Sequence, residues 1–222
     1  MWKKALNKFL EEWKDRKEVL SAVLSGSRVT SFASKYSDID VYIILSDDVE
    51  WRERGNKMID GYLIEYFANP IKQIKSYFKE EFERNSFTTA RILSIGKILF
   101  DKTGIGKKLK KEAQMLMKKK FKKINKTSME LMKYGLWDNL DNLKDLFDKN
   151  SENFDFLYNF HLRQILVTYS KFLRTEIPPY SRLVEFFTNE KFREEYKFAE
   201  FPDKKFSRLF VKCLKSEGRN EK

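Results

Sequence analysis

Two aspartates separated by one residue are the first candidates for chemistry. Asp38 and Asp40 flank Ile39 at the start of an apolar run that continues to Leu45. Side chains alternate faces along a strand, so both carboxylates would project from the same side. Such neighbours repel each other unless a cation lies between them, and paired divalent ions about 3.5–4 Å apart commonly catalyse in-line attack at phosphorus. The two aspartates therefore predict a site for Mg²⁺ or Mn²⁺.

A third carboxylate is expected close to this pair. Glu65 is the candidate because it lies in the middle of the segment 62–67, which predicts a strand. If that strand pairs beside the first one, Glu65 reaches the same spot as the two aspartates. Asp60 is the alternative acid, but Asp60-Gly61 already has an explanation as a turn, so Glu65 is preferred.

The available ligand types restrict the metal. His161 is the only histidine and Cys213 the only cysteine, so one chain cannot assemble a zinc site from His and Cys ligands. A site built from oxygen ligands suits Mg²⁺ or Mn²⁺, which accept carboxylates and substrate phosphates. The lone thiol also excludes an internal disulfide, which favours a reducing compartment such as the cytoplasm.

A Gly-Ser pair precedes the carboxylates. Gly26 and Ser27 follow a short apolar segment, 21–24, that we expect to be a strand. Where a strand ends in Gly-Ser and turns into a helix, backbone N–H groups and a hydroxyl face an anion. Glycine also lets a phosphate come close to the backbone. The pair therefore indicates a cradle for the phosphates of an NTP.

The elements that position these residues follow from the spacing of apolar positions. Residues 3–20 have apolar positions three and four apart, which is typical of an amphipathic helix, whereas short runs rich in Val and Ile predict strands. The glycines at 104 and 106 mark the expected boundary between a first domain, 1–106, and a helical second domain, 107–222. After the helix, the first domain is expected to contain strands 21–24, 38–45 and 62–67, helices 71–83 and 87–95, and an edge strand 97–100.

The composition indicates a chain that folds unaided. Its 222 residues are 41% hydrophobic and include 20 Phe and 10 Tyr, which is enough to fill a core. The longest apolar runs, such as 41–45, are far shorter than the roughly 20 residues that a membrane span needs. The first residues lead into a charged amphipathic stretch rather than a signal peptide. We therefore expect a soluble, cytoplasmic protein.

The order and spacing of the motifs resemble a known group of enzymes. Gly26-Ser27, ten intervening residues, Asp38-Ile39-Asp40 in an apolar strand and a carboxylate strand after it are similar to the DNA polymerase beta-type nucleotidyltransferase superfamily. The segments 36–39 and 63–67, with a helical second half, resemble its antibiotic-modifying branch, which includes the kanamycin and lincosamide nucleotidyltransferases. After residue 70 the likeness is only architectural.

The resemblance implies an α+β fold, with a small mixed-sheet nucleotidyltransferase domain followed by a C-terminal α-helical bundle. It implies an enzyme that transfers a nucleoside monophosphate from an NTP, with ATP the expected donor, to a hydroxyl of a small-molecule acceptor, releasing pyrophosphate. Asp38, Asp40 and Glu65 would be the catalytic metal ligands, and Gly26 and Ser27 would lie at the phosphates.

One departure from the family concerns positive charge. Many relatives carry an Arg-Gly pair shortly after Gly-Ser, where this chain has Val29-Thr30-Ser31-Phe32. Arg28 or Lys35 is the candidate to bind the phosphates instead.

The expected helix around 134–148 carries an acidic stripe. Four acids recur at spacings of three and four residues, opposite the apolar stripe: Asp138, Asp141, Asp145 and Asp148. A solvated face is the preferred explanation. The alternative is that the stripe lines a cleft between the domains, where Asp141 or Asp145 would act as general base on the acceptor hydroxyl or attract a cationic acceptor. Glu176, Glu185 or the metal-bound water network is the fallback.

Two further features bear on whether nucleic acid is a substrate or partner. His161 is expected to pack within a helix, and it lacks the preceding arginine of the helical RNases that partner minimal nucleotidyltransferases. The lysine-rich segment 107–126 and a net charge of +12 would support nonspecific nucleic-acid binding. Only Phe121 is interleaved among these lysines, so a lysine-coated helix is the preferred interpretation.

Two other functions stay open. One is a noncatalytic nucleotide-binding or protein-interaction module that kept the fold, and the other is a nucleotidyltransferase that acts on a protein or RNA partner. The three carboxylates favour an enzyme over a noncatalytic module, and the net charge of +12 argues against a strongly cationic acceptor such as an aminoglycoside.

Overall fold

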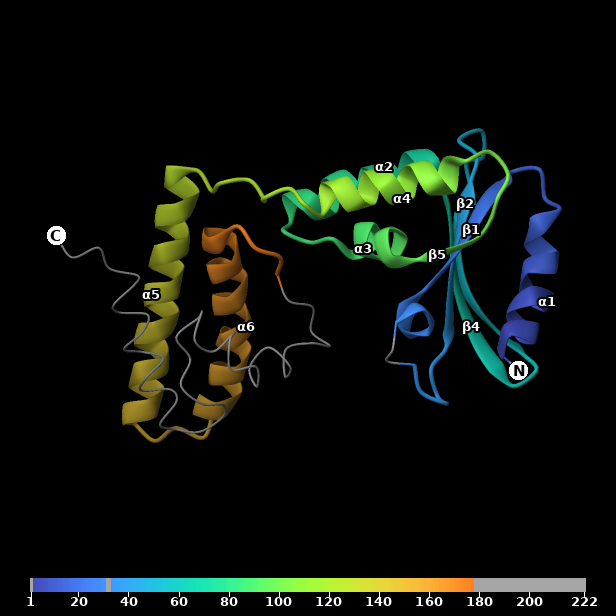
Figure 1. The fold of residues 1–222 in the computed structure, drawn as a ribbon. Coiled ribbons are helices and arrows are strands. Elements are labelled where there is room, and N and C mark those ends of the chain that lie inside the picture. Colours follow the sequence, from blue (N-terminus) through green and yellow to red (C-terminus); the bar gives the residue numbers. More distant parts are fainter. Residues whose placement is uncertain (1, 31–32, 178–222) are drawn as a thin grey trace. The chain divides into compact units, whose positions relative to one another are not determined.

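The computed structural model describes residues 2–30 and 33–177 (Figure 1). The chain divides into two compact units, Met1–Lys120 and Phe121–Lys222. Glu185 and Cys213, both named by the sequence analysis, lie outside the described residues.

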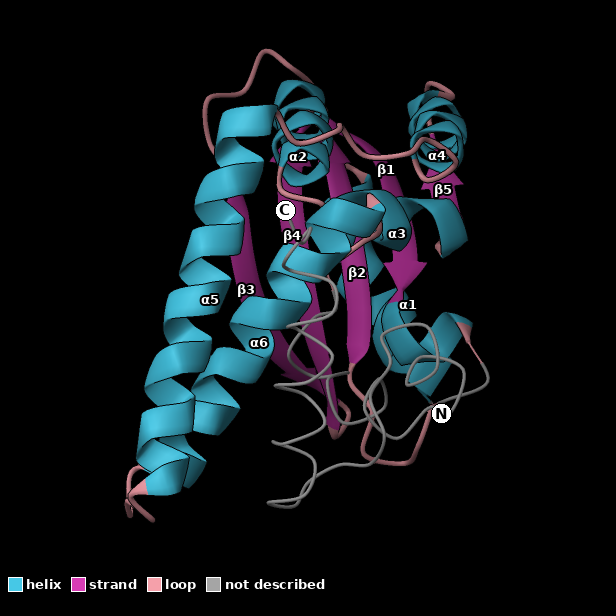
Figure 2. Cartoon of the chain, turned by 90° about the vertical axis from the view of Figure 1, so that its left-hand side faces the viewer, coloured by secondary structure: helices cyan, strands magenta, loops and turns pink. Residues whose placement is uncertain are grey.

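A five-stranded mixed sheet forms the centre of the first unit (Figure 2). In spatial order its strands are β3 (Glu53–Ile59), β4 (Tyr62–Pro70), β2 (Ile39–Leu45), β1 (Val19–Ser25) and β5 (Lys97–Asp101). β2 pairs antiparallel with β1 and parallel with β4. β3 forms an antiparallel hairpin with β4 at one edge, and β5 runs antiparallel to β1 at the other. The sheet is therefore mixed because of a single parallel pair, β2 with β4.

One face of the sheet is covered by α1 (Trp2–Lys14) (Figure 1). The large side chains that α1 buries are Leu6, Phe9 and Trp13. From β2, the same core takes every second residue: Ile39, Val41, Ile43 and Leu45. Burying each of these side chains contributes about 1.5–3 kcal/mol, which fixes this face of β2 against the helix. The intervening residues Asp40 and Tyr42 therefore project from the other face.

Three helices lie on that opposite face: α2 (Ile71–Glu83), α3 (Thr88–Ile95) and α4 (Ile105–Leu116) (Figure 1). The Glu81 carboxylate accepts hydrogen bonds from the backbone N–H and the hydroxyl of Thr89, at 2.8 and 2.6 Å, which ties α2 to the first turn of α3. α4 packs on α3, β1 and β5. A Cβ at Gly106 would overlap the Ser21 hydroxyl, so this glycine allows α4 to approach β1. Gly106 thus lies inside the packed unit, whereas the sequence places a domain boundary there.

The second unit contains a helical hairpin. α5 (Lys126–Asp148) begins after Asn125, whose side chain accepts a hydrogen bond from the backbone N–H of Ser128 at 2.8 Å. α6 (Phe154–Leu173) packs against α5. Their shared core consists of Leu136, Leu143, Phe154, Tyr158, Ile165 and Leu166. The expected α+β fold, a small mixed sheet followed by helices, is confirmed.

Two expected elements differ from the structure. The sequence predicts a helix over 3–20, but α1 ends at Lys14, and Val19 already belongs to β1. The sequence predicts no strand between residue 45 and the Asp60-Gly61 turn, yet 53–59 forms β3. This strand lies at the edge of the sheet and is mostly exposed, so it lacks the apolar alternation by which strands are predicted.

Candidate active site

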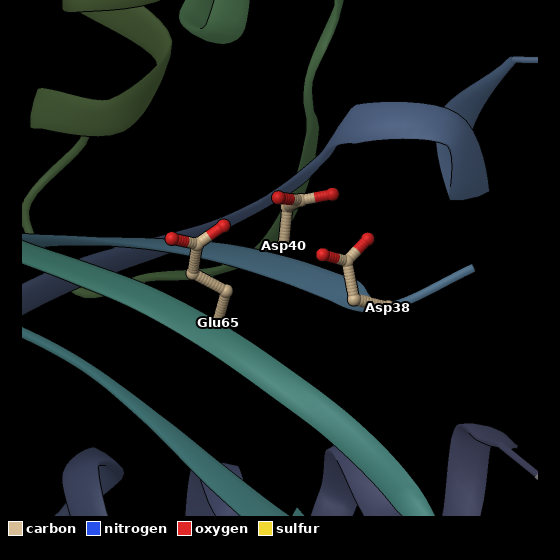
Figure 3. A group of neighbouring side chains, drawn as sticks. All are labelled: Asp38, Asp40 and Glu65. Atoms are coloured by element: carbon tan, nitrogen blue, oxygen red, sulfur yellow. The ribbon is translucent and has the colours of Figure 1, made fainter. Parts of the chain in front are cut away.

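The three predicted carboxylates come together on one face of the sheet (Figure 3). In the parallel pair β2–β4, Asp40 stands directly opposite Glu65. Asp38 lies just before β2, two residues from Asp40, and so projects from the same side. One carboxylate oxygen from each of the three residues lies within 4.8 Å of the others. The register of a single strand pair therefore builds the cluster.

The electrostatics of the cluster are unfavourable without a cation. Burial, and after it the nearby charges of Asp38 and Glu65, together raise the pKa of Asp40 from its ordinary 3.8 to about 6. An added positive charge would reverse both charge effects. The donor set, carboxylate oxygens alone, fits a hard divalent cation such as Mg²⁺ or Mn²⁺.

Gly26 closes one side of the cluster. β1 ends at Ser25, whose partner across the sheet is Asp40, and the chain then turns into the short 3₁₀ helix η1 (Gly26–Val29). Gly26 has φ = +66°, a left-handed conformation that glycine adopts at little cost. A Cβ at this position would also overlap the Asp40 carboxylate. Gly26 thus lies against the Asp40 carboxylate, while a role for the Gly-Ser turn at the phosphates stays a prediction.

Arg28 braces the chain before the carboxylates. Its Nε donates to the Asp38 carbonyl at 3.2 Å and its Nη2 donates to the Ser37 carbonyl. The guanidinium also lies 5.4 Å from the centre of the Trp2 ring. These contacts hold the backbone that carries Asp38, while a role for Arg28 at the phosphates stays a prediction. Lys35, the other candidate, is exposed and lies over the Tyr36 ring.

Arg54 belongs to the site although the sequence did not indicate it. Its guanidinium donates to Glu65 Oε1 at 2.8 Å, and it lies 4.8 Å from the centre of the Phe67 ring. Its side chain is 71% exposed, whereas that of Glu65 is 29% exposed. Arg54 comes from β3, the strand without an apolar pattern. The Asp60-Gly61 turn was the one available signal, because a turn before a strand suggests a hairpin partner.

A cavity of about 570 Å³ adjoins the carboxylates on the same face of the sheet. Tyr42 and Phe67 line it, and each is two residues beyond a carboxylate on its own strand. Helices α2 and α3 contribute the far wall. The complete lining is Tyr42, Arg52, Glu53, Arg54, Phe67, Asn69, Tyr77, Glu81, Thr88, Thr89 and Ile92. This volume is in the range of small-molecule sites.

The remaining predicted residues do not join the cluster. Asp60 lies in the β3–β4 turn with φ = +50° and pairs with Lys8 at 2.7 Å. Asp141 and Asp145 are exposed on α5 of the second unit, where Asp145 pairs with Lys149 at 2.7 Å. Their role as general base stays a prediction. His161 is partly buried in α6 and approaches Gln164 Oε1 at 3.4 Å.

Comparison with known proteins agrees with this geometry. Residues 6–137 match the family model described as a nucleotidyltransferase domain, which is more than half of the chain. The chain belongs to the nucleotidyltransferase domain family. The matched residues include the Gly-Ser turn, all three carboxylates and the cavity. Nucleotidyltransferase domains generally use a divalent metal ion and an NTP, which fits the carboxylate cluster.

The solved structures that match this chain include one whose match covers most of its length. It is a nucleotidyltransferase-like protein from Exiguobacterium sibiricum 255-15, with 14% sequence identity and a TM-score of 0.48. The match covers 97% of this chain and 74% of that one. No curated protein matches the sequence. Among the helices in the described part of the chain, none has the length and apolar character that a membrane crossing requires.

Proposed function

We propose that this nucleotidyltransferase transfers a nucleoside monophosphate from an NTP, with ATP the expected donor, to a hydroxyl group of a small-molecule acceptor and releases pyrophosphate. The observation that carries the proposal is the cluster of Asp38, Asp40 and Glu65 beside the Gly-Ser turn. The likeness of 36–39 and 63–67 to the antibiotic-modifying branch supports a small acceptor. Mg²⁺ or Mn²⁺ is the proposed metal.

The three carboxylates would hold the metal, and two features of the backbone place them. Asp40 and Glu65 are fixed by the register of β2 with β4, and Asp38 by the hydrogen bonds from Arg28 to its carbonyl and that of Ser37. A divalent ion bound here supplies charge stabilisation to the phosphoryl oxygens and lowers the pKa of an attacking hydroxyl. The chain itself contributes positioning and a preorganised negative site.

The Gly-Ser turn would hold the phosphates of the NTP. Gly26 brings backbone next to Asp40 with no side chain between them, so a phosphate can approach both the backbone and the metal-binding carboxylates. The Ser27 hydroxyl is available from the same turn. We propose that pyrophosphate leaves from this side of the cluster.

A thermal-shift experiment tests the binding part of the proposal. Mn²⁺ or Mg²⁺ with an NTP should raise the melting temperature of the wild type, because a ligand that binds only the folded state stabilises it. The rise should be far smaller in Asp40→Asn. Asp60→Asn is the matched control, because Asp60 is an aspartate of the same sheet region, in the turn between β3 and β4, that lies outside the cluster. Equal shifts in wild type and Asp40→Asn would remove Asp40 from the metal site.

A turnover assay tests the catalytic part. The chain is incubated with Mg²⁺, each labelled NTP and a panel of acceptors, and released pyrophosphate is measured. Asp38→Asn, Asp40→Asn and Glu65→Gln should each lower turnover by at least about a hundredfold, the loss expected when electrostatic stabilisation is removed. A large loss of turnover in Asp60→Asn with a small loss in Glu65→Gln would mean that Asp60 is the third ligand. Metal-dependent NTP binding without any pyrophosphate would favour a noncatalytic nucleotide-binding module.

A further inference from the structure

The cavity beside the carboxylates lies opposite the Gly-Ser turn. Gly26 follows the end of β1, which pairs with the start of β2, whereas the cavity begins at Tyr42 and Phe67, further along β2 and β4. It also extends toward β3, on the side of β4 away from β1. The three carboxylates therefore stand between the turn and the cavity.

In-line phosphoryl transfer needs this arrangement. The attacking hydroxyl and the leaving pyrophosphate must lie on opposite sides of the phosphorus. If the phosphates lie at Gly26 and Ser27, as the proposed function requires, the acceptor must approach the metal from the Glu65 side. The cavity lies on that side, and Arg54 links it to the cluster through its hydrogen bond to Glu65.

The cavity walls favour a ligand with a flat ring. The rings of Tyr42 and Phe67 lie side by side on the sheet, with centres 6.1 Å apart and planes within 19° of each other. Asn69 Nδ2 donates to Tyr42 Oη at 3.1 Å, which holds that ring in place. Tyr77 and Ile92 face them from the helices. Such a surface offers stacking and apolar contact to a planar group.

The lining balances two arginines, Arg52 and Arg54, with two glutamates, Glu53 and Glu81, and the position suited to an anion is Arg52. Both acids in the lining are engaged by neighbouring groups: Glu81 accepts two hydrogen bonds from Thr89, and Glu53 accepts one from Tyr66 Oη. Arg52 donates to the neutral Tyr77 Oη at 3.0 Å and makes no ion pair with the described residues. A carboxylate or phosphate on the ligand could accept charge-assisted hydrogen bonds from this guanidinium.

We propose that this cavity binds the acceptor, and that the acceptor is a small molecule carrying a hydroxyl group, a flat ring and an anionic group. The inference rests on the proposed function for the placement of the hydroxyl, and on the cavity alone for the chemistry of the ligand. Arg52 binds the anionic group, and the aromatic wall binds the ring.

Binding of three matched probes tests the proposal without nucleotide or metal. 4-Hydroxybenzoate, 4-hydroxybenzamide and 4-hydroxybenzylamine share a hydroxyl and a ring and differ in charge. Their affinities for the full chain are measured by ligand-observed NMR titration. We expect the benzoate to bind at least about tenfold more tightly than the amine, the size of effect expected from one charge-assisted hydrogen bond.

Two variants connect this binding to the cavity. Arg52→Gln should remove the preference for the benzoate. Thr88 is exposed and lies in the lining, so Thr88→Trp should lower the affinity for all three probes by tenfold or more. Arg84→Gln and Thr103→Trp are the matched controls, because both residues are exposed and lie outside the lining. Each control should bind like the wild type.

The outcomes separate this inference from the proposed function. Three results would each overturn the assignment of the cavity as the acceptor site. They are no binding of any probe at millimolar concentration, equal binding of the probes to wild type and Thr88→Trp, and tighter binding of the amine than of the benzoate. The thermal shift by Mn²⁺ and NTP, measured on the same samples, reports on the proposed function independently. A normal shift with no probe binding leaves the nucleotidyltransferase proposal standing and rejects the cavity as the acceptor site.

Discussion

Gly26 satisfies two constraints at once, one from its backbone and one from its neighbour. Its φ of +66° is strained for residues with a side chain, and a Cβ would overlap the Asp40 carboxylate. Gly104 shares the first constraint but not the second, because its φ is +80° and no atom lies within 4 Å of its Cβ position. The two glycines therefore separate backbone strain from the close approach to the site.

Gly26→Ala should lower the free energy of unfolding by about 2 kcal/mol or more, against about 1 kcal/mol for Gly104→Ala. Because the added methyl group displaces Asp40, Gly26→Ala should also weaken Mn²⁺ binding, whereas Gly104→Ala should not. Urea unfolding and a Mn²⁺ titration measure the two effects. Equal losses of stability and unchanged metal affinity would show that Asp40 moves aside at no cost.

Asp40 makes stability depend on pH in a defined direction. Its pKa is about 6 in the folded chain against an ordinary 3.8, so between these pH values the folded state binds more protons than the unfolded state. Stability therefore falls as pH rises through this window. The contribution of the protonated carboxyl is fully present below about pH 3.8 and is lost above about pH 6.

Asp40→Asn should therefore stabilise the metal-free chain at pH 7.5 and leave it nearly unchanged at pH 4. The gain at pH 7.5 should be about 1 kcal/mol, since the partial exposure of Asp40 reduces the effect of its neighbours. Urea unfolding in the presence of EDTA at both pH values measures it. The same stability difference at pH 4 and pH 7.5 would contradict the link to ionisation.

At the scale of elements, the strands that carry the carboxylates could be predicted from sequence. The Val- and Ile-rich segment that became β2 and the segment 62–67 of β4 both have strand composition, and the turn at Asp60-Gly61 marks the start of β4. Side-chain alternation then places Asp38 and Asp40 on one face. Because these patterns are local in the sequence, they can be read without knowledge of the tertiary structure.

The pairing of the strands could not be predicted in the same way. Nothing in a single strand specifies that β2 and β4 lie side by side in parallel, with β3 turned to the edge. β3 itself is polar and mostly exposed, so apart from the turn at Asp60-Gly61 nothing in the sequence indicated Arg54 or its contact with Glu65. The burial of Asp40 and the cavity likewise depend on how distant segments pack.

The β3–β4 hairpin yields a testable competition at Glu65. Arg54 donates to Glu65 Oε1, so it would compete with a bound cation for this carboxylate and repel the cation by charge. Arg54→Gln should therefore tighten Mn²⁺ binding by about three- to tenfold, a modest effect because Arg54 is well exposed. Calorimetric titration measures the affinity, with Arg84→Gln as the control. Weaker binding in Arg54→Gln would mean that Arg54 orients Glu65 for the metal.

At the scale of the whole molecule, the helical unit is the sequence-based candidate for the general base. Asp141→Asn or Asp145→Asn should lower acceptor-dependent transfer while leaving NTP binding nearly unchanged, since neither residue is in the carboxylate cluster. Pyrophosphate release and the NTP-dependent thermal shift provide the two readouts. Full activity in both variants would identify the stripe as a solvated face and turn the search to Glu176, Glu185 or the metal-bound water.

The parallel pairing of β2 with β4 also has a kinetic consequence. The β3–β4 hairpin is local and can form within microseconds, whereas pairing β4 with β2 must first close the intervening chain. The three carboxylates therefore meet only when the hairpin docks, so a cation finds its complete site late in folding. Mn²⁺ should then slow unfolding and leave the refolding rate unchanged, because it stabilises contacts absent from the transition state. Stopped-flow chevrons with and without Mn²⁺ test this, and faster refolding would mean that the cluster assembles before the barrier.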